Sequence, residues 1–388
     1  MTCPAVLGGS SAFPGGLAFA RPMVPPLDVV MARLQPSYDA GVLTNGPLVR
    51  ALEECAAERL GTDHVVAVGS CTAGLMLALR VLDVRRPVVL PGFTFSASAH
   101  AVAWNALELR FAECDPETFQ LDVDDAVGRL DGAGALLATH IFGAPCRAAE
   151  LQNCARRSGI PIVFDAAHAF GASHQGRPVG GFGDAEVFSL SPTKIVVAGE
   201  GGIVTTPHVE VANALRAGRD YGNPGDYDTR FVGLNARMSE LHAALALESF
   251  ALVDEHLARR RALAAQYSAG LAGVPGVAPQ IVADGDLSTY KDFTIQIDQP
   301  RFGLSRDELV KALQSDGIDT RCYFDPPVHR QTSYAYLEPV MLPVTDAVSS
   351  RVISLPMWGG LPFDAVDRVV AVIAEVHARA EEVRAALD

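Results

Sequence analysis

The chain has 388 residues, of which 49% are hydrophobic and 20% are charged. This composition is typical of a folded globular protein, and the length predicts two domains or one large domain with an appendage. The 45 acidic and 31 basic residues give a net charge of −14, which argues against nucleic acid or an anionic membrane as the main partner. No apolar run approaches the roughly 18 to 20 residues that a membrane-spanning helix needs.

The first 24 residues are interrupted by glycines and prolines and lack the basic start of a signal peptide. We therefore predict a flexible lead-in over residues 1–24. The seven cysteines form no CxxC pair and no zinc-type cluster with histidine. We expect reduced thiols, no metal and a cytoplasmic protein.

The first clear helix signal is TNGPLVRALEECAAERLG, residues 44–61. Pro47 suits the first helical turn, apolar residues follow at helical spacing, and Gly61 suits the end of the helix. Seven short apolar runs then occur between residues 60 and 206. Unbroken runs of this length predict strands that are covered on both faces, and therefore a largely parallel α/β sheet. The runs are HVVAVGS, RPVVLPG, ALELRFAECD, GALLATHIFG, IPIVFDAA, AEVFSLS and GGIVTT.

A long helical run begins at Ser239 and is long enough to link two domains. We place a domain boundary near residue 260, because the sequence after it has proline-rich stretches and a different pattern of residues. Helix-like segments are predicted at 305–317 and 363–387.

Two polar side chains follow predicted strands. Asp165 ends the run IPIVF, where a carboxylate can meet a ligand at the carboxyl end of a strand, although aspartates there also cap the next helix or turn. Lys194 follows AEVFSLS and a Ser-Pro turn. Unlike arginine, lysine can lose its proton and become a nucleophile for Schiff-base chemistry. The alternative is a solvated surface lysine.

The segment GSCTAGLMLAL, residues 69–79, places small and hydroxyl residues where a strand meets a helix. Backbone amides at such a helix start, with the hydroxyl of Thr72, can bind an anion. An ordinary N-cap by Ser70 or Thr72 is the alternative. An anion site, a carboxylate about 90 residues later and a lysine about 30 residues after that resemble the order in fold type I pyridoxal-phosphate enzymes.

The resemblance becomes closer on reading whole segments, and the chain resembles the DegT/DnrJ/EryC1/StrS family of sugar aminotransferases. This likeness implies an α/β fold of type I, with a mostly parallel seven-stranded central sheet in a large cofactor domain at 25–260. A smaller α+β domain would occupy 261–388. The segments that carry the resemblance are AGVLTNGPLVRALEE, GTDHVVAVGSCTAGLMLAL, LPGFTFSASAHAV, FAECDPETFQLD, THIFGAPC, FDAAHAFGASHQGRPVGGFGDAEVFSLSPTKIVVAGEGGIVTT, GLNARMSELHAALAL, GIDTRCYFDPPVHRQ and SLPMW.

The resemblance also implies roles for individual residues. Lys194 would form the Schiff base with pyridoxal phosphate and then carry a proton, Asp165 would keep the pyridine nitrogen protonated, and His168 would lie near the phenolic oxygen. Asn235 would reach the cofactor phosphate of the neighbouring subunit, which implies a homodimer with shared active sites. The further cofactor-binding residues would be the phosphate turn Cys71, Thr72 and Ala73, the hydroxyl of Ser189, and Phe95 stacked on the ring. Cys71 stands where the family usually has glycine, which would strain a left-handed backbone.

The implied reaction moves an amino group from glutamate or glutamine, by way of pyridoxamine phosphate, to a nucleotide-linked keto-deoxysugar. Such a reaction serves secondary-metabolite or cell-surface sugar biosynthesis. Amination at C4 of a dTDP-4-keto-6-deoxyhexose is favoured, and a 3-keto sugar nucleotide or an inosose is the alternative. Arg321, Tyr323 and His329 are candidates for substrate contacts, with packing in the small domain as the alternative. A regulatory protein without turnover would predict loss of the lysine, the aspartate or the phosphate turn, and all three are present.

Overall fold

The structure, a computed structural model, describes residues 3–387. Its central sheet has the strand order β1-β9-β8-β5-β4-β2-β3. All neighbouring strands in it are parallel except that β9 runs antiparallel to both β1 and β8. All seven predicted runs form these strands, so the mostly parallel seven-stranded sheet is confirmed. The strands are β1 His64–Val68, β2 Val88–Pro91, β3 Leu109–Ala112, β4 Ala135–Thr139, β5 Ile162–Asp165, β8 Ala185–Ser189 and β9 Gly202–Thr206.

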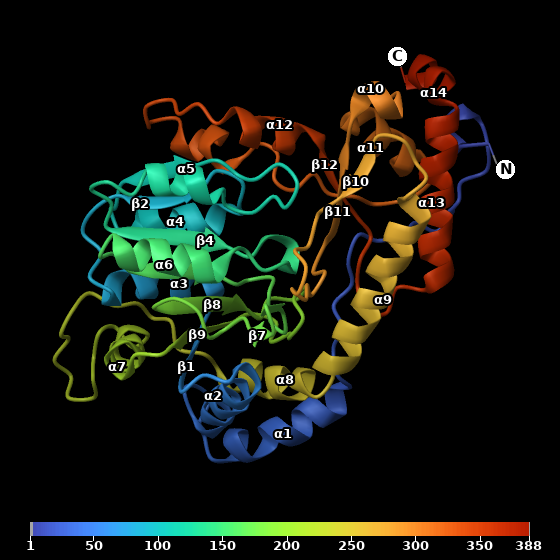
Figure 1. Cartoon of the computed structure of the whole chain (residues 1–388). Coiled ribbons are helices and arrows are strands. Elements are labelled where there is room, and N and C mark those ends of the chain that lie inside the picture. Colours follow the sequence, from blue (N-terminus) through green and yellow to red (C-terminus); the bar gives the residue numbers. More distant parts are fainter. Residues whose placement is uncertain (1–2, 388) are drawn as a thin grey trace.

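Helices cover both faces of this sheet (Figure 1). Successive residues of a strand point to opposite faces, so Val66 and Val68 of β1 join one apolar cluster while Val65 and Ala67 join another. The first face is covered by α3 Cys71–Val81, α4 Ser96–Trp104 and α7 Val209–Gly218. The second face is covered by α2 Pro47–Leu60, α5 Val123–Gly128, α6 Ala148–Arg157 and α8 Glu240–Phe250.

The predicted helix at 44–61 is confirmed as α2, with Pro47 in its first turn and Gly61 in the left-handed conformation at its end. The long run after Ser239 divides into α8 and α9, which spans Val253–Leu271. Helix α1, Leu27–Asp39, packs against α8.

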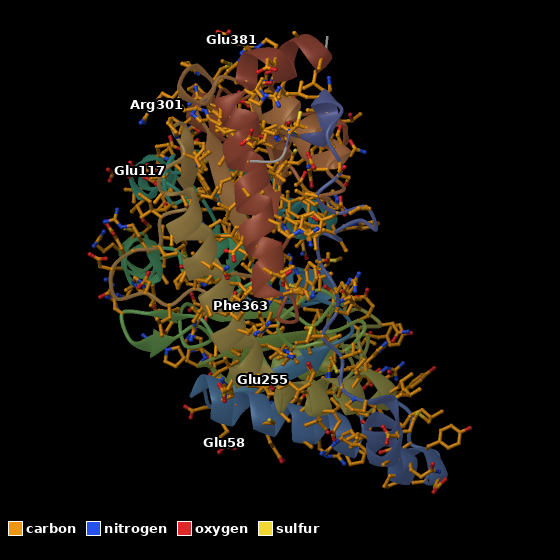
Figure 2. All side chains as sticks on the ribbon, turned by 90° about the vertical axis from the view of Figure 1, so that its right-hand side faces the viewer. Glu58, Glu117, Glu255, Arg301, Phe363 and Glu381 are labelled. Atoms are coloured by element: carbon orange, nitrogen blue, oxygen red, sulfur yellow. The ribbon has the colours of Figure 1, made fainter. Side chains whose placement is uncertain are left out.

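The C-terminal part contains a second sheet, antiparallel and in the order β10-β11-β12. Helix α13, Phe363–Ala378, runs beside α9 (Figure 2). Cζ of Arg259 on α9 lies 4.5 Å from the ring centre of Phe363. The strands are β10 Val277–Pro279, β11 Phe293–Ile297 and β12 Val352–Leu355, and the helices are α10 Gln299–Phe302, α11 Arg306–Ser315, α12 Pro343–Arg351, α13 Phe363–Ala378 and α14 Ala380–Leu387. The shorter elements of the chain are the strand pair β6 Ser173–His174 and β7 Arg177–Pro178 and the 3-10 helices Ala5–Leu7, Ile141–Gly143, Val328–Arg330 and Thr332–Tyr334.

The two apolar cores divide within α9. Leu257 packs in the core of the large sheet, whereas Leu263 and Tyr267 pack in the core of the small one. We retain residue 260 as the proposed boundary. Part of the C-terminal half nevertheless lies on the large sheet, because Val328 and Leu342 pack in the same cluster as strand β2.

The prediction of a flexible lead-in is wrong for the segment from Phe13 to Phe19. Phe13, Leu17 and Phe19 are buried, and Phe13 and Leu17 belong to the core of the small sheet. The amide of Leu17 donates to the Gly317 carbonyl at 2.7 Å. The Leu17 and Gly317 segments are about 300 residues apart along the chain, so no local sequence pattern predicts their contact. Across residues 3–387, no helix is both long and apolar enough to cross a bilayer.

Candidate active site

A cavity of about 330 Å³ lies where strands β4, β5 and β8 end and helix α3 begins. Parallel strands end at the same edge of a sheet, which is where α/β folds bind ligands. The structure brings most of the predicted site residues to this one cavity. Those that line it are Cys71, Thr72, Phe95, Asp165, His168, Ser189, Lys194 and Tyr323.

Helix α3 begins at this cavity, where the sequence predicts an anion site. Ser70 caps the helix, and its hydroxyl accepts a hydrogen bond from the Ala73 amide at 3.1 Å. Ala73 is the third residue of the helix. Cys71 and Thr72 line the cavity, whereas Ala73 does not. The first amides of a helix have no acceptor within it and favour an anion. Cys71 is the first residue of the helix, so it is not in the left-handed conformation that would strain it.

A glycine allows strand β9 to pass this helix start. A Cβ added to Gly202 would lie 2.8 Å from the Cys71 nitrogen and 2.9 Å from its Cα. Only glycine fits at such a close approach. This contact gives a structural reason for part of the GEGG cluster after Lys194.

Asp165 is buried at the end of β5 and is held on both carboxylate oxygens. The Ser98 hydroxyl donates to Oδ2 at 2.6 Å, and the Ala167 amide donates to Oδ1 at 3.1 Å. Thr94 Oγ1 lies 3.0 Å from Ser98 Oγ and 3.0 Å from Thr139 Oγ1, which extends the network. Burial raises the pKa of Asp165, and the bond from Ser98 opposes that rise.

Lys194 lies in the turn after β8 and lines the same cavity. Burial lowers the pKa of Lys194 to about 8, and the positive charge of Lys291 contributes to the lowering. A larger fraction of the amine is thus neutral and nucleophilic near pH 7 than for a solvated lysine. This placement excludes the surface-lysine alternative.

His168 follows β5 in the loop that Asp165 begins. Burial lowers the pKa of His168 well below its ordinary value, and the charges of Lys194 and Lys291 act in the same direction. The imidazole is therefore neutral at physiological pH. Its Nδ1 lies 4.0 Å from Asp292 Oδ2, and both buried atoms lack a hydrogen-bond partner among the described residues.

Several residues that line this cavity are not predicted from the sequence. Lys291 precedes β11 in the C-terminal half, and Thr139, Ser191 and Glu200 also line the wall. The scarcity of lysine could have indicated Lys291, because the chain has only three lysines, at 194, 291 and 311. No sequence feature indicates the role of Ser98, since its bond to Asp165 joins segments 67 residues apart.

Besides Ala73, three other predicted residues lie outside the cavity. Asn235 is exposed on the surface of the chain, and its Oδ1 accepts from Arg237 Nη2 at 3.3 Å. Arg321 is exposed and lies 5.3 Å from the ring centre of Phe19. The expected substrate contact of His329 is wrong for this structure. Its side chain is fully buried, with Nε2 3.0 Å from Asp346 Oδ1, so the packing alternative holds for it.

Residues 29–374 match the model of the DegT/DnrJ/EryC1/StrS aminotransferase family. The chain belongs to this family. It is 33% identical to a dTDP-3-amino-3,4,6-trideoxy-α-D-glucose transaminase of Streptomyces venezuelae, over 92% of this chain and 93% of the relative. It is 31% identical to a UDP-N-acetyl-3-dehydro-α-D-glucosamine 3-aminotransferase of Acidithiobacillus ferrooxidans, over 84% of this chain and 87% of the relative.

Solved structures of sugar aminotransferases share the fold. The crystal structure of DesI in the presence of its TDP-sugar product has a TM-score of 0.93 at 35% identity, covering 98% of each chain. The crystal structure of S. venezuelae DesV in complex with a ketimine intermediate has a TM-score of 0.85 at 32% identity, covering 92% of this chain and 99% of that one. The protein is therefore a sugar aminotransferase of fold type I, as the sequence predicts.

Enzymes of this family depend on pyridoxal phosphate, and the cavity fits that cofactor. It offers an amine with a lowered pKa at Lys194, a buried carboxylate at Asp165 and a helix start for a phosphate. Phe95 also lines the cavity and is 57% exposed, so its ring is available to stack on a planar ring.

Proposed function

We propose that this enzyme transfers the amino group of glutamate or glutamine to a nucleotide-linked keto-deoxysugar. The observation that carries the proposal is the meeting of Lys194 and Asp165 on one cavity, in a chain whose relatives are named for amino sugars on nucleotides. When bound, pyridoxal phosphate would supply an electron sink for the carbon that gains or loses the amine.

We assign the protein groups as follows. Lys194 would hold the cofactor through its amine and then move a proton to and from the reacting carbon. Asp165 would keep its negative charge beside the ring nitrogen, and Ser98 holds that carboxylate in place. The start of α3 and the hydroxyl of Ser189 would bind the phosphate. Phe95 would stack on the ring, and neutral His168 would lie beside its phenolic oxygen.

C4 is the favoured position of amination, as the residues around His168 and 320–329 suggest by resemblance. C3 is the second candidate, because both named relatives carry 3-amino products or a 3-dehydro substrate in their names. The exposed position of Asn235 supports, in addition, a homodimer in which this side chain serves the neighbouring site.

The test is to load the enzyme with pyridoxamine phosphate and offer it 4-keto and 3-keto sugar nucleotides and an inosose. We expect a keto-deoxysugar nucleotide to restore the visible spectrum of the pyridoxal form. Magnetic resonance of the product then locates the new amine at C4 or C3. Reaction with the inosose alone, or with none of these ketones, would refute the proposed acceptor.

A further inference from the structure

We propose that Lys291 binds the α-carboxylate of the amino donor, a role that rests on the proposed function. The donor is an amino acid, so it brings a negative charge to the centre of the cavity. The cavity contains one cationic side chain besides the amine of Lys194 among the described lining residues, and that side chain is Lys291.

The distribution of lysine in the chain supports a special role. Of 31 basic side chains other than histidine, only Lys194, Lys291 and Lys311 are lysines. Lys311 is exposed on helix α11, whereas the other two line the cavity. Arginine provides nearly all the surface cations, so a second lysine in the cavity is not explained by solvation of the surface.

Lys291 is held firmly in place. Its side chain is only 6% exposed, and Nζ donates to Asp292 Oδ1 at 2.7 Å. Two residues before it, Thr289 donates from its hydroxyl to the His168 carbonyl at 2.6 Å and from its amide to the Gly143 carbonyl at 3.1 Å. These bonds tie the segment before β11 to the loops after β4 and β5. The Lys291 amine therefore lies on the same inner wall as His168.

The chemistry of the donor accounts for a cation at this depth. In an α-amino acid, the carboxylate is attached to the carbon that carries the amine, so it must lie beside the reacting atoms. A keto-sugar presents hydroxyl groups there, and its diphosphate lies a sugar ring away. An ammonium group has three donors, and the bond to Asp292 uses one, which leaves two for a carboxylate. The charge of Lys291 lowers the pKa of Lys194 and that of His168, as a cation close to both groups does.

The decisive experiment measures donor binding separately from sugar turnover. Holoenzymes of wild type, K291Q, K291Q/D292N and K311Q are titrated calorimetrically with α-methylglutamate, a donor analogue without a Cα hydrogen. We expect Kd to rise about 10- to 100-fold in both Lys291 variants, because a hydrogen bond to a charged group is lost. We expect no change in K311Q, the exposed lysine. The double variant removes the partner charge as well, so an unpaired Asp292 cannot explain its loss.

A second measurement assigns the loss to the donor. After each variant is loaded with pyridoxamine phosphate, the acceptor half-reaction should keep the wild-type KM for the sugar nucleotide. Wild-type donor binding in K291Q and K291Q/D292N, or a rise in the sugar KM in place of the donor Kd, would overturn the role of Lys291. Failure of every sugar to react would refute the proposed function while leaving the donor titration interpretable.

Discussion

Asp165 is a buried carboxylate whose charge depends on the groups around it. A hydrogen bond to the charged form favours that form, so the bond from Ser98 at 2.6 Å keeps the pKa of Asp165 lower than burial alone would allow. Removal of this hydroxyl in S98A should raise that pKa further, because a hydrogen bond to the charged carboxylate is lost.

The carboxyl of S98A then stays protonated to a higher pH, so the acid side of the kcat profile should move upward. We also expect kcat at its optimum to fall about tenfold. The pH profiles of S98A and S96A make the comparison, because Ser96 lies on the same helix but is partly exposed. Equal profiles in the two variants would show that Ser98 does not support the charge.

Lys194 should react with pyridoxal phosphate at lower pH than an ordinary lysine does. Its neutral fraction rises as pH passes through a pKa of about 8. Because the charge of Lys291 helps to lower that pKa, K291Q should move the midpoint of cofactor capture to higher pH. The rate of spectral change when apoenzyme meets the cofactor measures the midpoint. K311Q, tested in the same buffers, should match wild type, and an unmoved midpoint in K291Q would contradict this electrostatic coupling.

At the scale of elements, patterns within a segment predict well and contacts between segments do not. The seven strands were predictable because each is an unbroken apolar run, and α2 because Pro47 and Gly61 mark its ends. Lys194 and Asp165 were predictable because both follow such strands. Lys291 reaches the cavity only because the segment before β11 packs against the loops after β4 and β5. His329 was misassigned for the same reason, since its side chain lies against Asp346 and against Gly92, which follows strand β2.

The start of helix α2 depends on a carboxylate from helix α8. Glu240 is fully buried and accepts from the amides of Gly46 and Val49 with Oε1, at 2.9 and 3.0 Å, and from that of Leu48 with Oε2, at 2.9 Å. A negative charge also suits a helix start. The two segments are about 190 residues apart along the chain. The sequence therefore indicates the start of α2 at Pro47 but not the carboxylate of Glu240 that accepts from its amides.

The variant E240Q should lower the free energy of unfolding by about 2 to 3 kcal/mol. The glutamine side chain would present its NH₂ group to buried backbone amides that need an acceptor. Hydrogen bonds that the charged carboxylate accepts would therefore be lost. Denaturant unfolding of the holoenzyme measures the change. The matched control is E248Q, also on α8, whose partner Arg33 has a side chain that is 44% exposed. It should cost about 0 to 1 kcal/mol. Equal losses in both variants would mean that Glu240 has no special role at this helix start.

At the scale of the whole molecule, exposed apolar side chains occur in the segments before and after the predicted shared residue. Asn235 is exposed, and near it in the sequence Tyr221, Val232 and Leu241 are 51%, 79% and 52% exposed. Apolar side chains exposed together mark a surface that favours association. These positions support the proposed homodimer, in which Asn235 completes the site of the neighbouring subunit.

Mixed dimers test that arrangement directly. K194A and N235D should each be inactive alone. A dimer with one subunit of each kind would contain one site in which both residues are native, provided that Asn235 acts across the interface. Random exchange makes half of the dimers mixed, so we expect about a quarter of wild-type turnover per site, as two-fold symmetry requires.

The control is a mixture of K194A with D165N. Both residues line the cavity of one chain, so no exchange of subunits can bring a native pair together. That mixture should stay inactive while the first recovers. Subunit exchange is verified by mass spectrometry of differently tagged chains. If verified mixed dimers of K194A and N235D stay inactive, Asn235 acts within its own chain or not at all, and the shared site is refuted.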